Sequence, residues 1–526
     1  MSMRHDTLVY IMSKYVKGDM TPVVPKRFRT VFFMLVACFA LWGLLNNMTD
    51  NLVPAFETIF GIKPSESAGV QISFYGAYAV LAIFAAMMVE EFSYRTGVLT
   101  GLGFYILGAL IYIPACIAQS FDLYLLGIFI LAGGLSILET SCNPYVLSLG
   151  PEKTAVRRLN FAQAFNPVGS LAGIFLAKYL ILANLEGNSK AVQLFWVCVP
   201  YVGLIAVAAV IWFFFVRYKA PEGGSEQYEM PVQDDSMKTG ISKPKLIGLY
   251  LICIAIPVGI LIAVNTYCEN PGIFGNMVYQ LLFVMVGPIV FTLIIRNYRL
   301  MLCELLKLPR YWMGIIAQFF YVGVQIAAWT WLNKYCCKQL GLASDVAATY
   351  YLISLILFIV CRWIATYYMK KFNPADMMSF FAIVAIACCL GTMYLPTHVL
   401  FKIGGLPFSA NVICLILMSG GMSLMFPTIY GIALGGLNNR CVKLGAAGLI
   451  MAILGGAVIT PWMGSIIEST ESIWFGLIPG CDAQWDAELK TSDLAVRASF
   501  IVPAICFTVV LIYSLLFRKP LTSSDK

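Results

Sequence analysis

Charged side chains are scarce in this sequence, and histidine is almost absent. Only 12% of the 526 residues are Asp, Glu, Lys or Arg, whereas roughly a quarter of residues are charged in soluble globular domains. The two histidines, His5 and His398, both lie outside the long apolar runs. The shortage of charge excludes an ordinary soluble fold, and the position of the histidines excludes them from any proton relay within those runs.

Motifs of the common enzyme classes are also missing. The sequence has no Cys-x-x-Cys or Cys/His spacing of the zinc type, no Ser/His/Asp set and no nucleotide-binding loop. Its 16 cysteines lie mostly in apolar runs, where cysteine typically behaves as a small buried hydrophobic residue. We therefore expect that the protein is not an enzyme and holds neither a metal nor a cofactor.

Long apolar runs make up most of the chain. Hydrophobic residues account for 60% of it, and the mean hydropathy is +0.82. Because about 20 apolar residues suffice for a helix to cross a bilayer, the runs predict an all-α polytopic membrane protein. The predicted spans are 30–57, 67–92, 98–118, 122–149, 157–184, 193–217, 246–266, 277–296, 309–333, 345–369, 376–395, 408–435, 441–468 and 496–517.

Basic residues indicate how these spans are oriented. If the N-terminus lies on the inner side, the inner segments carry 26 Lys and Arg residues and the outer loops carry 7. Since cytoplasmic loops are enriched in Lys and Arg, this distribution predicts that both termini are cytoplasmic. The net charge of +8 thus reflects membrane topology and does not indicate binding to nucleic acid.

Two halves of similar length flank an extra pair of spans. The predicted segments are a cytoplasmic N-terminal tail (1–29), a six-helix bundle (30–217), a cytoplasmic linker (218–245), an inserted transmembrane hairpin (246–296), a second six-helix bundle (297–517) and a cytoplasmic tail (518–526). Twin six-helix halves predict a binding site between them, near the middle of the bilayer. The hairpin carries no evident chemistry, and we expect it to serve in packing.

Two acidic residues fall deep inside predicted spans, where ionisable groups are costly and usually functional. Asp50 lies in the first span, with Asn47 and Trp42 near the same helical face. Glu139 lies in the fourth span. Because burial disfavours the charged form of a carboxyl group, either residue could take up a proton. The alternative for Asp50 is a helix end in outer water, in which case Glu139 alone would carry the proton coupling.

Two basic residues also fall within predicted spans. Lys178 is near the outer end of the fifth span, where a long side chain can extend to the membrane surface. Arg362 lies toward the cytoplasmic end of the eighth span, which predicts an ion pair at an inner gate or in the packing.

Two spans carry polar faces that suit a sugar. Amides donate and accept hydrogen bonds, and aromatic rings contact the C–H faces of a sugar, although an aromatic stripe alone is typical of packing. The face on the seventh span comprises Gln318, Tyr321, Gln325 and Trp329. The face on the fifth span comprises Asn160, Gln163 and Asn166.

Several motifs, taken together, resemble the fucose:proton symporter family of the major facilitator superfamily. They are NNMTDNLVPAF (46–56), LETSCNPYVLSLGPE (138–152), RLNFAQAFNPVGS (158–170), AQFFYVGVQIAAWTWL (317–332), MFPTIYGIALGGL (425–437) and GGAVITPWMG (455–464). The resemblance covers all twelve core helices, and the inserted hairpin falls outside the usual pattern.

This resemblance implies a major facilitator fold and a monomeric sugar:proton symporter of the bacterial inner membrane, which works by alternating access. It assigns proton coupling to Asp50 and Glu139, and it also assigns sugar coordination to Glu139. No cofactor is implied beyond the proton as the coupling ion. The remaining residues implied as lining the substrate cavity are Trp42, Asn47, Gln163, Asn166 and Gln325.

The sequence leaves the identity of the sugar open. Phe426 stands where the family has a tyrosine, and Lys178 replaces a neutral polar residue. The alternatives to L-fucose are glucose, galactose or N-acetylglucosamine, and an uncoupled sugar facilitator is a further one. A membrane sugar sensor is the alternative outside transport, but the linker at 218–245 is too short for a signalling domain.

Overall fold

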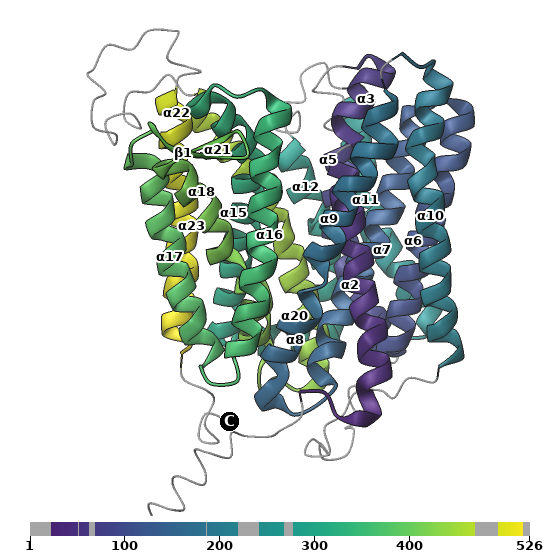
Figure 1. Cartoon of the computed structure of the whole chain (residues 1–526). Helices are drawn as coiled ribbons and strands as arrows, with labels where there is room; N and C mark the ends of the chain where they lie inside the picture. The colour runs from purple at the N-terminus through teal and green to yellow at the C-terminus, as the bar shows by residue number, and fades with distance from the viewer. Residues whose placement is uncertain are drawn as a thin grey trace, which may run out of the picture.

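A computed structural model describes residues 23–50, 52–62, 69–185, 187–218, 241–267, 277–468 and 493–518. Within these residues, 13 helical segments are long and apolar enough to cross a membrane. Figure 1 shows them running side by side in two bundles. The prediction of an all-α polytopic membrane protein is confirmed. Most of the predicted tails and linker (1–22, 219–240 and 519–526) lies outside the described residues.

The first bundle is formed by the N-terminal half of the chain. It comprises α2 (Arg29–Asp50), α3 (Leu52–Phe60), α5 (Gly69–Glu91), α6 (Tyr94–Ala118), α7 (Phe121–Ser148), α8 (Ala155–Gln163), α9 (Asn166–Leu176) and α10 (Lys190–Arg217). Helices α2 and α9 approach closely because glycine faces backbone: a Cβ on Gly169 would lie 1.9 Å from the carbonyl oxygen of Ala40. Such small residues allow close helix contacts within a membrane.

The second bundle is formed by the C-terminal half. It comprises α15 (Pro309–Leu340), α16 (Ser344–Tyr368), α17 (Pro374–Tyr394), α18 (Ala410–Met422), α19 (Met425–Leu434), α20 (Asn439–Met451), α21 (Gly455–Glu468), α22 (Asp493–Ala498) and α23 (Ile501–Leu516). A short antiparallel hairpin of β1 (Val399–Ile403) and β2 (Leu406–Ser409) connects α17 to α18. Helices α15 and α21 pack as α2 and α9 do, since Gly455 faces the carbonyl oxygen of Phe319.

The predicted transmembrane hairpin is only partly a pair of long helices. Its first span is α11 (Lys243–Tyr267), but the region predicted as the single span 277–296 forms two shorter helices, α12 (Met277–Val284) and α13 (Val286–Ile294). Tyr250 of α11 donates a hydrogen bond to the carbonyl oxygen of Val80 on α5. The hairpin therefore packs against the first bundle, and α14 (Arg296–Leu306) leads from it to α15. The predicted domain boundaries stay predictions.

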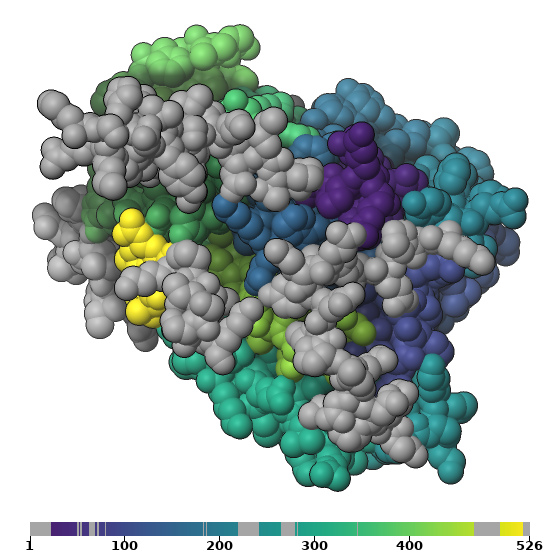
Figure 2. Space-filling model, turned by 90° about the horizontal axis from the view of Figure 1, so that it is seen from below, coloured from purple at the N-terminus to yellow at the C-terminus, as the bar shows by residue number. Residues whose placement is uncertain are grey.

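The two bundles contact each other at the end where α2 begins and α23 ends, which we call the terminal end. There Glu90 of α5 forms ion pairs with Arg440 and Lys443 of α20, at 3.2 and 3.0 Å. A Cβ on Gly431 of α19 would lie 2.8 Å from Val156 of α8. Figure 1 shows α8 and α20 meeting near this end, and Figure 2 looks onto it, with yellow-green residues of the second bundle at its centre.

Candidate functional site

Glu139 lies in α7 with its carboxyl group enclosed by protein. Its side chain is 2% exposed, and neither carboxylate oxygen has a hydrogen-bond partner among the described residues. Every residue of α7 from Leu131 to Val146 is buried, so the helix offers this carboxyl group no route to bulk water along its own surface. A buried polar group without a partner is costly, which favours a role in which a proton or a ligand completes its contacts.

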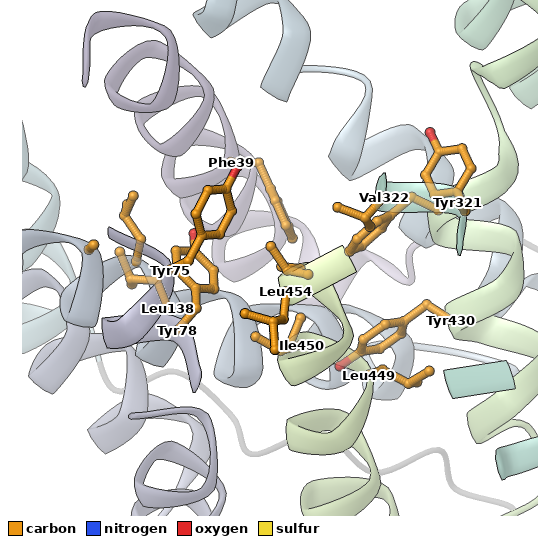
Figure 3. Close-up of a cluster of buried hydrophobic side chains, with 14 of the residues drawn as sticks. Phe39, Tyr75, Tyr78, Leu138, Tyr321, Val322, Tyr430, Leu449, Ile450 and Leu454 are labelled. Atoms are coloured by element: carbon orange, nitrogen blue, oxygen red, sulfur yellow. The ribbon is translucent and has the colours of Figure 1, made fainter. Parts of the chain in front are cut away.

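Trp42 and Tyr78 connect α2 to the same region. The indole Nε1 of Trp42 donates to the phenol oxygen of Tyr78 at 3.0 Å. The Tyr78 phenol in turn interacts electrostatically with Glu139. Figure 3 shows Tyr78 beside Leu138, the residue before Glu139. The structure thus brings the predicted residues Trp42 and Glu139 together through a tyrosine that the sequence analysis did not single out.

Gln163 ends α8 and takes part in two contacts. Its Nε2 donates to Oδ1 of Asn143, one turn beyond Glu139, at 2.7 Å. Its carbonyl oxygen accepts from Nη1 of Arg362 at 3.0 Å. Proline has no N–H, so Pro167 cannot supply the helical hydrogen bond to this carbonyl, and the oxygen remains available to a partner on the other bundle.

Arg362 also binds a second carbonyl oxygen that a proline leaves without its helical donor. Its Nε donates to the carbonyl oxygen of Ser423, and Pro427, four residues further on, removes the helical donor for that oxygen. The guanidinium group is 4% exposed and lies over the ring of Phe358 at 4.5 Å. The predicted ion pair of Arg362 is wrong for the described residues, where this cation is held by carbonyl dipoles and an aromatic face instead.

Asn47 joins α2 to the second bundle. Its Oδ1 accepts a hydrogen bond from the hydroxyl of Tyr351 on α16 at 3.0 Å. The Tyr351 ring packs edge-on against Trp329, with 5.9 Å between ring centroids, and Nε1 of Trp329 donates to Oγ of Ser419 at 3.1 Å. Asn47 and Trp329, predicted from separate motifs, are therefore brought together through Tyr351.

Gln318 and Gln325 of α15 differ from Tyr321 on the same helix in their hydrogen bonds. Gln318 is 0% exposed, and neither its amide nitrogen nor its amide oxygen has a partner among the described residues. Gln325, two turns further along, is half-buried. Tyr321 donates instead to the carbonyl oxygen of Met422 at 3.0 Å. The two glutamines thus keep hydrogen-bonding capacity, whereas the hydroxyl of Tyr321 already holds α15 to α18.

Two further predicted residues of the fifth span hold helices together. The amide of Asn166 donates to the carbonyl oxygen of Phe39 at 3.4 Å, which ties α9 to α2. Asn160 is 0% exposed, and its amide reaches the hydroxyl of Thr428 on α19 at 3.4 Å. Asn160 therefore contributes to the contact between the two bundles.

Asp50 is the last residue of α2, and its side chain lies outside the described residues. Its predicted part in proton coupling stays a prediction. Lys178 is exposed in a π-helical turn after α9, with its Nζ 5.8 Å from the centre of the Tyr179 ring. This position suits a lysine that extends toward the membrane surface.

A layer of aromatic and aliphatic side chains from both bundles lies next to these groups. Figure 3 shows Tyr75 and Tyr78 on one side, with Tyr321, Tyr430 and Leu454 on the other. Tyr430 is 0% exposed, its hydroxyl has no partner among the described residues, and its phenol interacts electrostatically with Glu139 across the two bundles. Two phenols, one from each bundle, therefore face the same carboxyl group.

The sequence does not mark Tyr78, Tyr351 or Tyr430 as site residues. Each lies in a run where tyrosine is typical of packing, and hydropathy does not separate a packed ring from a phenol whose hydroxyl is used. The available signal was helical spacing: Tyr75 and Tyr78 are three residues apart in FYGAYA, and therefore share one face of the second span.

Comparison with known proteins places this arrangement among transporters. The family model described as "Major Facilitator Superfamily" matches residues 30–461. The L-fucose-proton symporter of Haemophilus influenzae is 35% identical over 492 residues, covering 93% of this chain and 97% of the relative. The L-fucose-proton symporter of Escherichia coli is 27% identical over 92% of both chains. A glucose/galactose transporter of Brucella abortus is 24% identical over 92% of this chain and 93% of that protein.

Solved structures show the same fold. The crystal structure of the Escherichia coli fucose:proton symporter superposes with a TM-score of 0.68 and 24% identity, covering 94% of this chain and all of the other. A structure of that transporter in an outward conformation gives the same TM-score and coverage. A proton:xylose symporter gives a TM-score of 0.60 at 11% identity, covering 94% of this chain and 97% of the other.

Proposed function

Because the chain belongs to the Major Facilitator Superfamily, we propose that it is a proton-coupled symporter that imports L-fucose or a related hexose. Two relatives that are named L-fucose-proton symporters support the substrate and the coupling ion. The observation that carries the proposal is the Glu139 carboxyl group, which is buried between the two bundles and has no hydrogen-bond partner among the described residues. A carboxyl group in that position requires a proton or a hydroxylated ligand to be satisfied.

The protein is a multi-pass membrane transporter, and we assign it to the bacterial inner membrane. The excess of Lys and Arg in alternate connecting segments supports cytoplasmic termini. The terminal end is then cytoplasmic, and the ion pairs of Glu90 close it. No cofactor takes part besides the proton, and the transporter acts as a monomer.

The proposed transport cycle begins with an outward-facing state. Asp50 and Glu139 take up a proton from the outer water, which removes buried charge and permits the sugar to bind. The sugar hydroxyl groups then meet the amides and rings of both bundles, and the bundles rock to open the terminal end. Loss of the proton to the cytoplasm restores the charge and resets the carrier. The residues proposed to contact the sugar are Glu139, Trp42, Asn47, Gln163, Asn166, Gln318, Tyr321, Gln325 and Trp329.

Uptake into proteoliposomes tests this proposal. Purified protein should accumulate labelled L-fucose against its gradient when the outside is acidic, and a protonophore should abolish the accumulation. Asp50→Asn should lose accumulation but keep sugar exchange, because the proton site is gone while the sugar contacts remain. Glu139→Gln should impair sugar binding or coupling. Asp122→Asn, which changes an exposed carboxylate at the start of the same helix, should transport as the parent does.

The outcome also separates the competing functions. Equal uptake with and without a pH gradient would identify an uncoupled facilitator. The Brucella abortus relative is named a glucose/galactose transporter, so unlabelled glucose, galactose and N-acetylglucosamine should be tested as competitors of labelled fucose. Stronger competition by one of these hexoses than by unlabelled fucose would replace the substrate but leave the mechanism in place.

A further inference from the structure

The face of α7 that carries Glu139 packs against α5 at Tyr78. Ser136, three residues before Glu139 and therefore on the same helical face, donates from its Oγ to the carbonyl oxygen of Tyr78 at 3.4 Å. Tyr78 is 2% exposed. Its phenol and the Glu139 carboxyl group thus interact inside a fixed helix–helix contact rather than at a flexible edge.

The hydrogen bond from Trp42 determines which way the Tyr78 hydroxyl points. An indole Nε1 can only donate, so at 3.0 Å the phenol oxygen of Tyr78 is the acceptor. The O–H of Tyr78 is then free to point at a group other than Trp42. The phenol interacts electrostatically with the carboxyl group of Glu139, whose oxygens carry no hydrogen bond among the described residues. Trp42, Tyr78 and Glu139 therefore follow one another as a donor, an acceptor with a free O–H, and an unsatisfied carboxyl group.

The other titratable groups around Glu139 are neutral donors. Tyr430 faces it from α19, and Cys142 interacts with it from its own helix. Cys38 of α2 lies against Cys142, and Tyr75 lies beside Tyr78. No Lys or Arg of the described residues forms an ion pair with Glu139. Tyr78 is therefore the group best placed to respond to the charge of this carboxylate.

We propose that Tyr78 is a positioning residue that couples sugar contact at Trp42 to the protonation of Glu139. With no sugar bound, Trp42 leaves the phenol O–H free for Glu139, and ionisation of this carboxyl group forms the hydrogen bond that stabilises the carboxylate. When a sugar hydroxyl takes the N–H of Trp42, the O–H of Tyr78 can turn to donate to that sugar hydroxyl, and the phenol oxygen then accepts a hydrogen bond from protonated Glu139. The proton comes from the outer water and binds a carboxylate oxygen, so no other bond is made or broken.

This inference rests on the proposed symport. It gives Trp42 a role as a hydrogen-bond donor in addition to any stacking of its ring against the sugar. Trp42 is half-buried, which leaves its ring edge partly accessible, whereas Tyr78 is enclosed. A ligand can therefore reach the first member of the chain but not the second. Sugar binding thus affects Glu139 through a change in the direction of hydrogen bonds, without movement of the backbone.

The test is Tyr78→Phe, which removes the hydroxyl and keeps the ring. Its matched control is Tyr105→Phe, because Tyr105 is also 0% exposed in the first bundle, its hydroxyl also lacks a partner among the described residues, and its interaction is with Tyr201 rather than Glu139. In proteoliposomes, Tyr78→Phe should reduce proton-driven accumulation about tenfold or more, as expected for loss of a hydrogen bond to a charged group. Gradient-free sugar exchange at saturating sugar should stay within about twofold, in keeping with a loss of the order of one neutral hydrogen bond or less. The pH profile of exchange should be displaced only in Tyr78→Phe.

A second variant keeps the test decisive if Tyr78→Phe folds poorly. Trp42→Phe removes the N–H and should reduce proton-driven accumulation at saturating sugar as Tyr78→Phe does, with a raised KM for exchange because a sugar contact is lost. The double variant should accumulate no less than Trp42→Phe alone, since both residues act on one chain. Additive losses in the double variant, or a Tyr78→Phe protein that matches Tyr105→Phe, would overturn the inference. Failure of the parent protein to couple uptake to protons would instead refute the proposed function.

Discussion

Neutralising Glu90 should open the terminal end of the transporter. Glu90 is bonded to two cations of the other bundle, and the side chains of Glu90, Arg440 and Lys443 are only 14%, 26% and 15% exposed. Each such pair contributes about 0.5–1 kcal/mol, so Glu90→Gln should cost the closed state about 1–2 kcal/mol, and the population of the open state should rise about 5–30-fold.

Alkylation of an introduced cysteine measures this population. Val156 packs against Gly431 where the bundles meet, so Val156→Cys should react slowly with a maleimide in the closed state. Adding Glu90→Gln should raise the reaction rate at position 156 by the same factor, read by peptide mass spectrometry in membranes without sugar. Thiols elsewhere in the chain do not interfere, because the modified peptide identifies the site.

Asp376 supplies the matched control for this experiment. It pairs with Arg518 at the same end of the molecule, but Asp376 lies in α17 and Arg518 follows α23, so this ion pair does not join the two bundles. Asp376→Asn should therefore leave the alkylation rate at position 156 unchanged. If Glu90→Gln also leaves the rate unchanged, the ion pairs do not hold the bundles together and the reasoning is refuted.

Three further substitutions test the packing around the site. Arg158 is 0% exposed and binds the carbonyl groups at the end of α7. Arg158→Ala should leave these buried oxygens unsatisfied, at about 1–3 kcal/mol for each, and should lower the thermal unfolding temperature. An unchanged temperature would contradict this. Tyr351→Phe should weaken sugar binding roughly 2–10-fold, measured by calorimetry, because it removes one hydrogen bond between the bundles. Tyr367→Phe, on the exposed side of the same helix, should leave sugar binding unchanged. Gly169→Val should abolish folded protein in size-exclusion chromatography, since the valine side chain would overlap the backbone of α2. Gly203→Val should be tolerated, because a Cβ at that position would have nothing within 4 Å. Equal yields of the two variants would show that close packing at α9 is not required.

Hydropathy and motif resemblance predicted the class of the protein, the two bundles and the burial of Glu139. These features follow from local composition, because insertion of a helix depends on its own residues. The predicted span 277–296 is interrupted at Met285 between α12 and α13, as the segment Ala410–Leu434 is interrupted between α18 and α19. The apolar composition predicts a span in such a region, but an apolar count does not encode where the helix is interrupted.

The partners of the site residues could not be predicted in the same way. Tyr351 reaches Asn47 and Arg362 reaches Gln163 only because helices of different bundles lie at particular rotations. A single sequence fixes which residues share a helical face, but not which face of another helix lies opposite. The expected ion pair of Arg362 is absent among the described residues for this reason, since carbonyl oxygens near helix breaks accept its hydrogen bonds instead.

The two oxygen atoms that accept hydrogen bonds from Arg362 cannot be removed by replacing the residues that carry them. Both belong to the main chain, so no replacement of the side chains of Gln163 or Ser423 can delete them. Their availability is encoded four positions downstream, where Pro167 and Pro427 withhold an N–H. The contact between the bundles therefore depends on two prolines that do not themselves form it, and a Pro→Ala change at either would supply a helical N–H that competes with the arginine for the oxygen.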